Sequence, residues 1–179
     1  SEVGRGGCRL KGSPNPVWVI AEQAGGGIAT VSFQLIGKAR KLADQLSASV
    51  EVILLGNDTA GLPQQLIAAG ADRVYLGNAA ELVVYQSELF TQIIAELALE
   101  NHPDIMLLGS TPMGRELAPL VAGKLKTGLT AHCIDLVLDE KNILQQKIPA
   151  YGGMLRNSSV QQHAQIATVT NGLLALPTL

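Results

Sequence analysis

The sequence predicts an α/β domain built on a doubly wound, mostly parallel, Rossmann-like sheet. Short apolar runs alternate with amphipathic segments of helical period in four successive units, which is the pattern of a parallel sheet with crossover helices. The apolar runs are uninterrupted, as expected for strands covered on both faces. Of the 179 residues, 47% are hydrophobic and only 16% are charged, which favours one compact and largely buried core.

The four units follow one another from Val17 to Thr127. Each begins with a short strand, and glycine or asparagine closes most of these strands. The helix that follows shows apolar residues at a spacing of three and four, and in the first helix the basic residues lean towards the C-terminal half, where the helix dipole favours cations. We expect strands at 17–21, 50–55, 73–76 and 105–108, helices at 32–46, 62–69 and 87–100, and a fourth helix in the later part of 104–127.

The last third of the chain has a different pattern, because its apolar runs are not separated by helical segments. The sequences Asp139-Glu140-Lys141-Asn142 and Tyr151-Gly152-Gly153 are typical turns. We therefore expect an antiparallel C-terminal extension at the edge of the sheet, with strands at 129–138, 143–150, 154–160 and 164–169.

The two ends of the chain differ in composition from its centre. Residues 1–16 are rich in glycine and proline and show no hydrophobic period, so we expect a flexible leader. Residues 171–179 contain Gly172 and Pro177 and are expected to be a linker. The single α/β domain then covers residues 17–170.

Composition and charge exclude several classes of function. The net charge of −2 gives no basis for binding nucleic acid or an anionic membrane. No apolar run approaches the ~20 residues that a membrane-spanning helix needs. Cys8 and Cys133 lie far apart and form neither a disulfide framework nor a paired metal motif, so we expect a reducing, cytoplasmic location.

The best candidate for a ligand site is the turn between the strand at 105–108 and the helix that follows it. Ser110 and Thr111 can cap this helix, and Gly114 allows the backbone to come close to another group. Backbone N–H groups at the helix start, the two hydroxyls and the Arg115 guanidinium could converge on a phosphate. The structural alternative, a capped helix whose Arg115 pairs inside the protein or across an interface, explains the same residues equally well.

A second glycine cluster, Gly25-Gly26-Gly27, follows the first strand. It does not match the Gly-x-Gly-x-x-Gly motif of dinucleotide-binding loops, and the P-loop motif is absent from the sequence. A plain turn, in which glycine is needed for backbone reasons, is the preferred interpretation.

The remaining polar residues form no catalytic or metal-binding pattern. His102, His132 and His163 stand singly, without the helical spacing or flanking carboxylates of a metal site. His132 and Cys133 are neighbours on an expected strand, so their side chains should point to opposite faces. We expect no enzyme that acts through its own side chains, and a hydrolase using Ser110 is the least favoured hypothesis because no partnered base is evident.

Two other polar pairs are also interpreted as structural. Ser158 and Ser159 lack the Gly-x-Ser-x-Gly elbow of α/β-hydrolases. Asp135 and Asp139 lie across the end of an expected strand and do not resemble a general acid and base held over one substrate.

Several motifs, in order, resemble the N-terminal domain of the α subunit of electron-transfer flavoproteins. Residues 109–111 and 114–119 followed by 127–131 are similar to the family's Gly-Ala-Thr, Gly-Arg-Asp-Leu-Ala-Pro and Thr-Gly-Leu-Thr-Ala run. The resemblance covers about residues 17–172. The other motifs that carry it are VWVIAEQ at 17–23, GKARKLA at 37–43 and PAYGG at 149–153.

The sequence departs from the family pattern in two places. Lys147-Ile148 stands where the family usually has an arginine before the Pro-Ala pair. The chain also ends at Leu179, where the resemblance implies that a second, FAD-binding domain with a Gly-Gln-Thr-Gly motif should begin.

The resemblance implies an adenine-nucleotide-hydrolase-like sheet that serves as a scaffold and contacts a β subunit. The complete carrier would hold FAD mainly through the second domain and accept electrons from dehydrogenases in the cytoplasm, or in the mitochondrial matrix of a eukaryote. Within this chain it implies packing and interface roles for Ser110, Thr111, Gly114 and Arg115. The alternative hypothesis is a stand-alone adenine-nucleotide-binding module that uses these four residues as its site.

Overall fold

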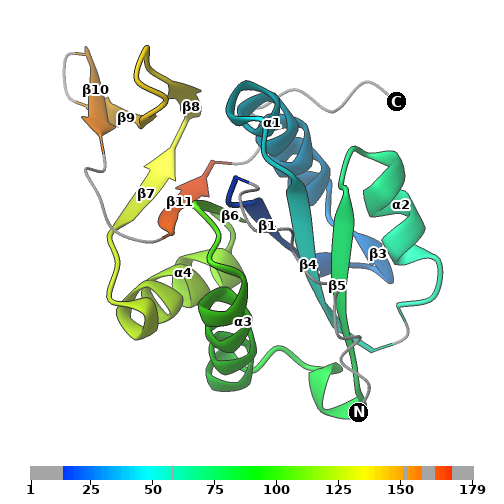
Figure 1. Cartoon of the computed structure of the whole chain (residues 1–179). Coiled ribbons are helices and arrows are strands. Elements are labelled where there is room, and N and C mark those ends of the chain that lie inside the picture. The colour runs from blue at the N-terminus through cyan, green and yellow to red at the C-terminus, as the bar shows by residue number, and fades with distance from the viewer. Residues whose placement is uncertain (1–13, 58, 151–152, 159–163, 171–179) are drawn as a thin grey trace.

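Six parallel strands form the central sheet of the protein, in the order β5-β4-β1-β6-β11-β7 (Figure 1). The computed structural model describes residues 14–57, 59–150, 153–158 and 164–170. The expected linker 171–179 and most of the expected leader 1–16 lie outside these residues. The strands are β1 (Val17–Ala21), β4 (Val50–Gly56), β5 (Arg73–Asn78), β6 (Ile105–Gly109), β7 (Leu129–Cys133) and β11 (Gln165–Val169).

In the described part of the chain, four α-helices cover the two faces of this sheet, as the alternating pattern predicted. The helices are α1 (Thr30–Leu46), α2 (Leu62–Ala68), α3 (Ser87–Asn101) and α4 (Pro112–Leu125), and a short 3-10 turn, η1 (Ala80–Leu82), precedes α3. On one face, α1 and α2 pack against Val17, Val19 and other strand residues. On the other face, α3 and α4 lie side by side (Figure 1) and pack against Trp18 and Ile20. Successive residues of β1 therefore enter opposite cores, which explains the uninterrupted apolar runs.

The last third of the chain confirms the antiparallel extension and corrects its extent. A separate antiparallel sheet has the order β10-β9-β8, with β8 (Asp135–Leu138), β9 (Leu144–Ala150) and β10 (Gly153–Ser158). The prediction that all four late strands are antiparallel at the sheet edge is wrong for β7 and β11, which join the main sheet in parallel. The expected strand 129–138 is also divided into β7 and β8.

The position of β11 has a physical explanation. Ile166, Ala167 and Val169 are all buried, and a strand that is apolar on both faces is stable only inside a sheet covered on both sides. The β8–β10 excursion takes the place of the usual crossover helix between two parallel strands. The Gln165 N–H donates to the Asp104 carbonyl at 2.8 Å, so β11 starts beside the start of β6, and the two strands pair in parallel.

Ion pairs fix the small antiparallel sheet to helix α1. The Asp135 carboxylate on β8 accepts hydrogen bonds from Lys38 Nζ on α1 at 2.5 Å and from Lys147 Nζ on β9 at 2.9 Å. Burial raises the pKa of Asp135, but the two lysines and the Leu136 N–H outweigh it and bring the pKa to about 2. Lys147, which departs from the arginine of the family pattern, thus forms part of a three-element ion-pair cluster.

A second polar cluster lies inside the amino end of the main sheet. The buried Glu51 carboxylate accepts hydrogen bonds from Trp18 Nε1 at 2.9 Å and from the Tyr75 hydroxyl at 3.1 Å. Arg73 stands 3.6 Å from the other carboxylate oxygen. The cluster gives the fully buried indole a polar partner, as buried tryptophan requires.

Candidate functional site

The candidate site lies at the carboxyl ends of β1 and β6, where the topology of the sheet reverses. From β1 the chain proceeds through α1 to β4 and β5 on one side of the sheet. It then returns to β6 on the other side of β1 and continues into α4 on the opposite face. Ligands of open α/β sheets bind in the crevice at such a switch point. The predicted turn from Gly109 to Arg115 is therefore at the position where a ligand would be sought first.

Thr111 caps helix α4, as the sequence predicted. Its backbone is extended (φ −84°, ψ 170°), and its Oγ1 accepts a hydrogen bond from Gly114 N–H at 3.0 Å. Pro112 follows at the first helical position, where its missing N–H has no cost. The Ser110 N–H donates to the Val169 carbonyl at 2.8 Å, which holds the turn against the end of β11.

Gly114 is required by the close approach of α4 to the end of β6. A Cβ atom at this position would lie 1.9 Å from the Gly109 carbonyl oxygen, far inside van der Waals contact. The sequence predicted that the backbone comes close to another group here, and this group is the protein's own strand.

Glu22, directly after β1, lies in the same crevice and was not singled out by the sequence analysis. Its side chain reaches Thr111, whose hydroxyl donates to Glu22 Oε1 at 2.8 Å, and the residue is only 9% exposed. Burial raises the pKa of Glu22, and the hydrogen bond from Thr111 partly opposes this effect. The signals in the sequence were an acidic residue directly after an apolar strand and its place in the VWVIAEQ motif at 17–23.

Arg115 is exposed at the rim of the crevice. Its backbone N–H makes the first helical bond of α4, and its Nε donates to the Thr111 carbonyl at 3.3 Å. Arg115 forms no ion pair with any other described residue. The Arg115 side chain is thus exposed beside the start of α4 while its Nε is bonded to the Thr111 carbonyl.

Ser110 and His132 are brought together by the fold, although they are 22 residues apart. Ser110 Oγ lies 2.8 Å from His132 Nδ1 in an exposed position. The expectation that Ser110 lacks a partnered base is therefore wrong. His132 stands at positive φ (57°) where β7 and β11 change register, and its N–H donates to Thr168 Oγ1 at 2.9 Å. No carboxylate among the described residues bonds to the imidazole, so the pair lacks the group that orients the base in a serine hydrolase.

The glycine cluster after β1 forms a tight hairpin and not a phosphate loop. Strands β2 (Gln23–Ala24) and β3 (Gly27–Ile28) pair on either side of Gly25 and Gly26. The φ angles of these two glycines are 60° and 80°, as a type I′ turn requires. No described atom lies within 4 Å of a Cβ placed on either residue, so their role is conformational, as the sequence indicated.

The other polar candidates have structural partners. Asp139 accepts hydrogen bonds from the N–H groups of Lys141 and Ile143, which close the β8–β9 turn and lower its pKa. Asp135 belongs to the ion-pair cluster with α1, so the two carboxylates do not face one substrate. Cys133 is fully buried, and this burial raises the pKa of its thiol to about 11. Ser159, His163 and Cys8 lie outside the described residues.

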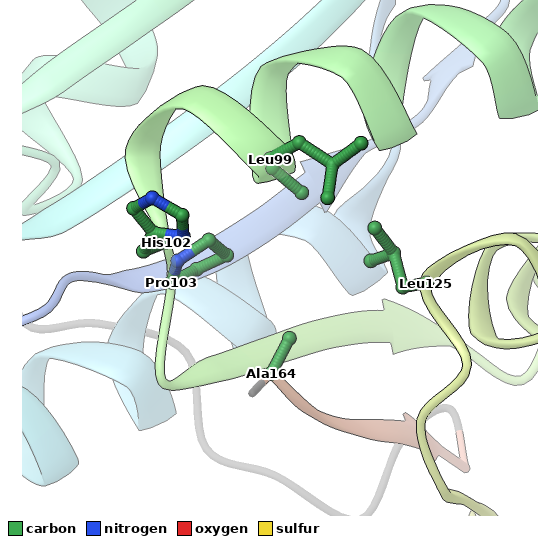
Figure 2. Close-up of a pocket in the computed structure, with 6 residues that line it drawn as sticks. Leu99, His102, Pro103, Leu125 and Ala164 are labelled. Atoms are coloured by element: carbon green, nitrogen blue, oxygen red, sulfur yellow. The ribbon is translucent and has the colours of Figure 1, made fainter. Parts of the chain in front are cut away.

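An apolar pocket lies at the opposite, amino-terminal end of the sheet (Figure 2). It has a volume of about 180 Å³ and is lined by the ends of α3 and α4 and by the start of β11. His102, which ends α3 at positive φ (48°), stands at its edge. The volume is below the ~300 Å³ at which small-molecule sites begin, so the pocket is too small for a nucleotide.

Within the described part of the chain, no group of three or more His, Cys, Asp or Glu side chains is arranged to hold a metal ion. Among the helices that the structure describes, none has the length and apolar character needed to cross a membrane.

The fold and the site define a class of protein. It is a Rossmann-like α/β domain whose switch-point crevice is occupied by its own side chains. Comparison with known families makes this specific. The family described as "Electron transfer flavoprotein domain" matches residues 17–178, and the chain belongs to this family.

Three relatives illustrate the similarity. The chain is 39% identical over 160 residues to an electron transfer flavoprotein subunit alpha of Thermoanaerobacterium thermosaccharolyticum, covering 88% of this chain and 48% of the relative. It is 44% identical over 138 residues to an electron transfer flavoprotein subunit alpha of Megasphaera elsdenii, covering 76% of this chain and 41% of the relative. It is 39% identical over 167 residues to the protein FixB of Rhizobium meliloti, covering 90% of this chain and 47% of the relative. The chain thus spans about half the length of these relatives.

Proposed function

We propose that this chain acts as the N-terminal domain of an electron-transfer flavoprotein α subunit. In the complete carrier it serves as a scaffold and as a contact surface for a β subunit, while FAD is held mainly by the other half of the α subunit. The carrier accepts electrons from dehydrogenases in the cytoplasm. The observation that carries the proposal is the match to the electron transfer flavoprotein family along residues 17–178, over about half the length of the α-subunit relatives.

The geometry of the switch point supports a scaffold role. Thr111 and Gly114 are used within the domain, one as a helix cap and the other as a packing glycine. Glu22 places a carboxylate where a cofactor phosphate would otherwise be expected. We therefore assign Ser110, Thr111, Gly114 and Arg115 to packing and to the subunit interface rather than to a cofactor.

The carboxyl edge of the sheet offers a surface for the β subunit. Arg115 is exposed there without an ion pair to another described residue. Val83 and Val84, in the loop that follows β5 and η1, are 61% and 66% exposed. Exposed apolar side chains and arginine are both characteristic of protein interfaces, because aliphatic burial supplies affinity and arginine supplies directed hydrogen bonds.

Co-expression of the full coding sequence with a β-type subunit of an electron-transfer flavoprotein tests this function. We expect a stable complex that carries FAD, measured by size-exclusion chromatography and by the flavin spectrum. Val83→Ser with Val84→Ser, or Arg115→Glu, should weaken the complex at least tenfold, whereas Leu99→Ser should not, because this exposed leucine lies at the opposite edge. A full-length product that binds neither flavin nor the β-type subunit would exclude the proposal.

The alternative, a stand-alone adenine-nucleotide module, is supported by the exposed Arg115 beside a helix start at the switch point. Isothermal titration of the 179-residue chain with AMP, ATP and FAD separates the two hypotheses. Micromolar binding of an adenine nucleotide would favour the module, and the absence of binding heat is the result expected for the scaffold.

A further inference from the structure

The switch-point crevice is filled from inside the domain. Glu22 Oε1 accepts a hydrogen bond from Thr111 Oγ1 at 2.8 Å. A Cβ atom added to Gly109 would lie 3.0 Å from Glu22 Oε1 and 2.9 Å from Val31 Cγ2, so three elements meet around the end of β6. The backbone of Glu22 is fixed as well, because its N–H donates to Ser32 Oγ at 2.8 Å and its carbonyl accepts from Ala29 N–H at 2.8 Å. The carboxylate therefore has a defined place in the crevice.

This place is the start of helix α4, where a negative charge is stabilised. The first N–H groups of a helix and its dipole carry a partial positive charge. The first turn of α4 contains no acidic residue of its own. Glu22, which comes from the strand on the other side of the switch point, supplies the charge through the capping hydroxyl of Thr111.

We propose that Glu22 is a built-in anion that excludes phosphate groups from the switch-point crevice and so keeps this domain free of nucleotide. The inference rests on the proposed scaffold function and names the residue that enforces it. A phosphate at the start of α4 would have to displace the carboxylate from Thr111 or share the crevice with a second negative charge.

The surroundings of Glu22 strengthen the exclusion. The Tyr85 hydroxyl is buried. Its pKa is raised to about 12, first by burial and then by the carboxylates of Glu116 and Glu22. A phosphate entering the crevice would therefore meet the Glu22 carboxylate and a neutral phenol, whereas Glu116 is exposed on α4 and Arg115 Nε donates to the Thr111 carbonyl at the rim.

The test compares Glu22→Ala and Glu22→Gln with the unchanged 179-residue chain. Glu116→Gln is the matched control, because it also removes a carboxylate near α4 but from an exposed position. Binding of AMP and of inorganic phosphate is measured by isothermal titration at constant ionic strength, after circular dichroism has shown that each variant is folded. We expect at least a tenfold gain in AMP affinity for Glu22→Ala over both the unchanged chain and Glu116→Gln.

Glu22→Gln keeps the shape of the side chain and its acceptor oxygen, so it remains informative if Glu22→Ala does not fold. For this variant we expect phosphate to raise the Tm more than chloride does at matched ionic strength, with no such difference in the unchanged chain. Folded variants that gain neither affinity nor a phosphate-dependent Tm would overturn the inference, and so would an equal gain in Glu116→Gln. Failure of both Glu22 variants to fold would also overturn it, because Glu22 would then be a structural requirement.

These outcomes are separable from a failure of the proposed function. If the unchanged chain binds no AMP and the variants gain nothing, only the role of Glu22 is refuted, and complex formation with the β-type subunit is unaffected. If the unchanged chain itself binds AMP at micromolar concentration, both the exclusion and the scaffold assignment fail.

Discussion

Replacing Asp135 by asparagine should separate the antiparallel sheet from helix α1 and lower the stability of the domain. The Asp135 carboxylate is the shared partner of Lys38 and Lys147, at 2.5 Å and 2.9 Å. Asparagine has nearly the same shape but no charge, so the substitution removes both ion pairs without opening a cavity. It also leaves two lysine ammonium groups side by side.

The magnitude of the effect follows from the pKa of Asp135. The pKa falls from its ordinary value of 3.8 to about 2 in the folded protein. At 1.36 kcal/mol per pH unit this difference corresponds to about 2 kcal/mol of stability at neutral pH. Because the Asp135 side chain is 32% exposed and solvent screens the ion pairs, we expect a measured loss of about 1–2 kcal/mol.

The way in which this loss of stability depends on pH is the most specific part of the prediction. A carboxylate with a lowered pKa in the folded state contributes stability above its unfolded pKa and loses this contribution as the pH falls. The free energy of unfolding of the unchanged chain and of Asp135→Asn should therefore differ most at pH 7. About half of the difference should be lost by pH 3, and nearly all of it below pH 2.

Urea denaturation followed by circular dichroism, at pH 7, 5, 4 and 3, measures these differences. Asp44→Asn is the matched control, since Asp44 pairs with Arg40 on the same helix but its side chain is 65% exposed. Such an exposed pair should contribute less than about 0.5 kcal/mol. A loss for Asp135→Asn that equals the control, or that stays constant from pH 7 to pH 3, would refute the reasoning.

Three other predictions concern the turn at α4 and the buried thiol. Gly114→Ala should destabilise the domain by about 3 kcal/mol in urea denaturation, because its Cβ would meet the Gly109 carbonyl at 1.9 Å. The control is Gly123→Ala in the same helix, because no described atom lies within 4 Å of the added Cβ. This substitution should stabilise the domain by up to ~1 kcal/mol. Equal losses of stability for the two variants would contradict the packing explanation. Thr111→Val should cost about 1–2 kcal/mol because it removes the helix cap and the donor to Glu22, and Thr111→Ser should recover more than half of this. Cys133 is fully buried, and its thiol has a pKa of about 11. It should therefore resist alkylation by iodoacetamide at pH 8 in the folded chain and react fully in denaturant. Labelling of the Cys133 peptide in the native state, measured by mass spectrometry, would exclude the buried placement.

Local features of the fold could be predicted from the sequence because their causes are local. The expected helix at 87–100 corresponds to α3 (Ser87–Asn101), since its apolar period and the following proline fix both the helix and its end. The capping role of Thr111 was predicted for the same reason, because a cap needs only its own residue and the N–H groups that follow it. The turn at Gly25 and Gly26 requires positive φ, which glycine adopts readily.

Contacts between distant residues were beyond such reasoning. The sequence indicated Ser110 but no base for it, because His132 reaches Ser110 only after β7 and β6 are placed in one sheet with β11 between them. Glu22 and Thr111 are 89 residues apart and meet only at the switch point. A carboxylate after a strand has the same local pattern whether it faces solvent or a helix start.

By itself, the sequence determined that the chain forms a parallel α/β domain, placed the four main strands and helices of its first two thirds, and carried the motifs of the electron-transfer flavoprotein family. The tertiary structure alone decided the insertion of β11 between β6 and β7, the attachment of the small sheet to α1 through Asp135, and the occupation of the crevice by Glu22. The physical reason is that hydrophobic period and capping act within a few residues, whereas strand order and buried charge depend on which surfaces meet. Several apolar strands fit an interior position of the sheet equally well, and only the packing of the whole chain selects among them.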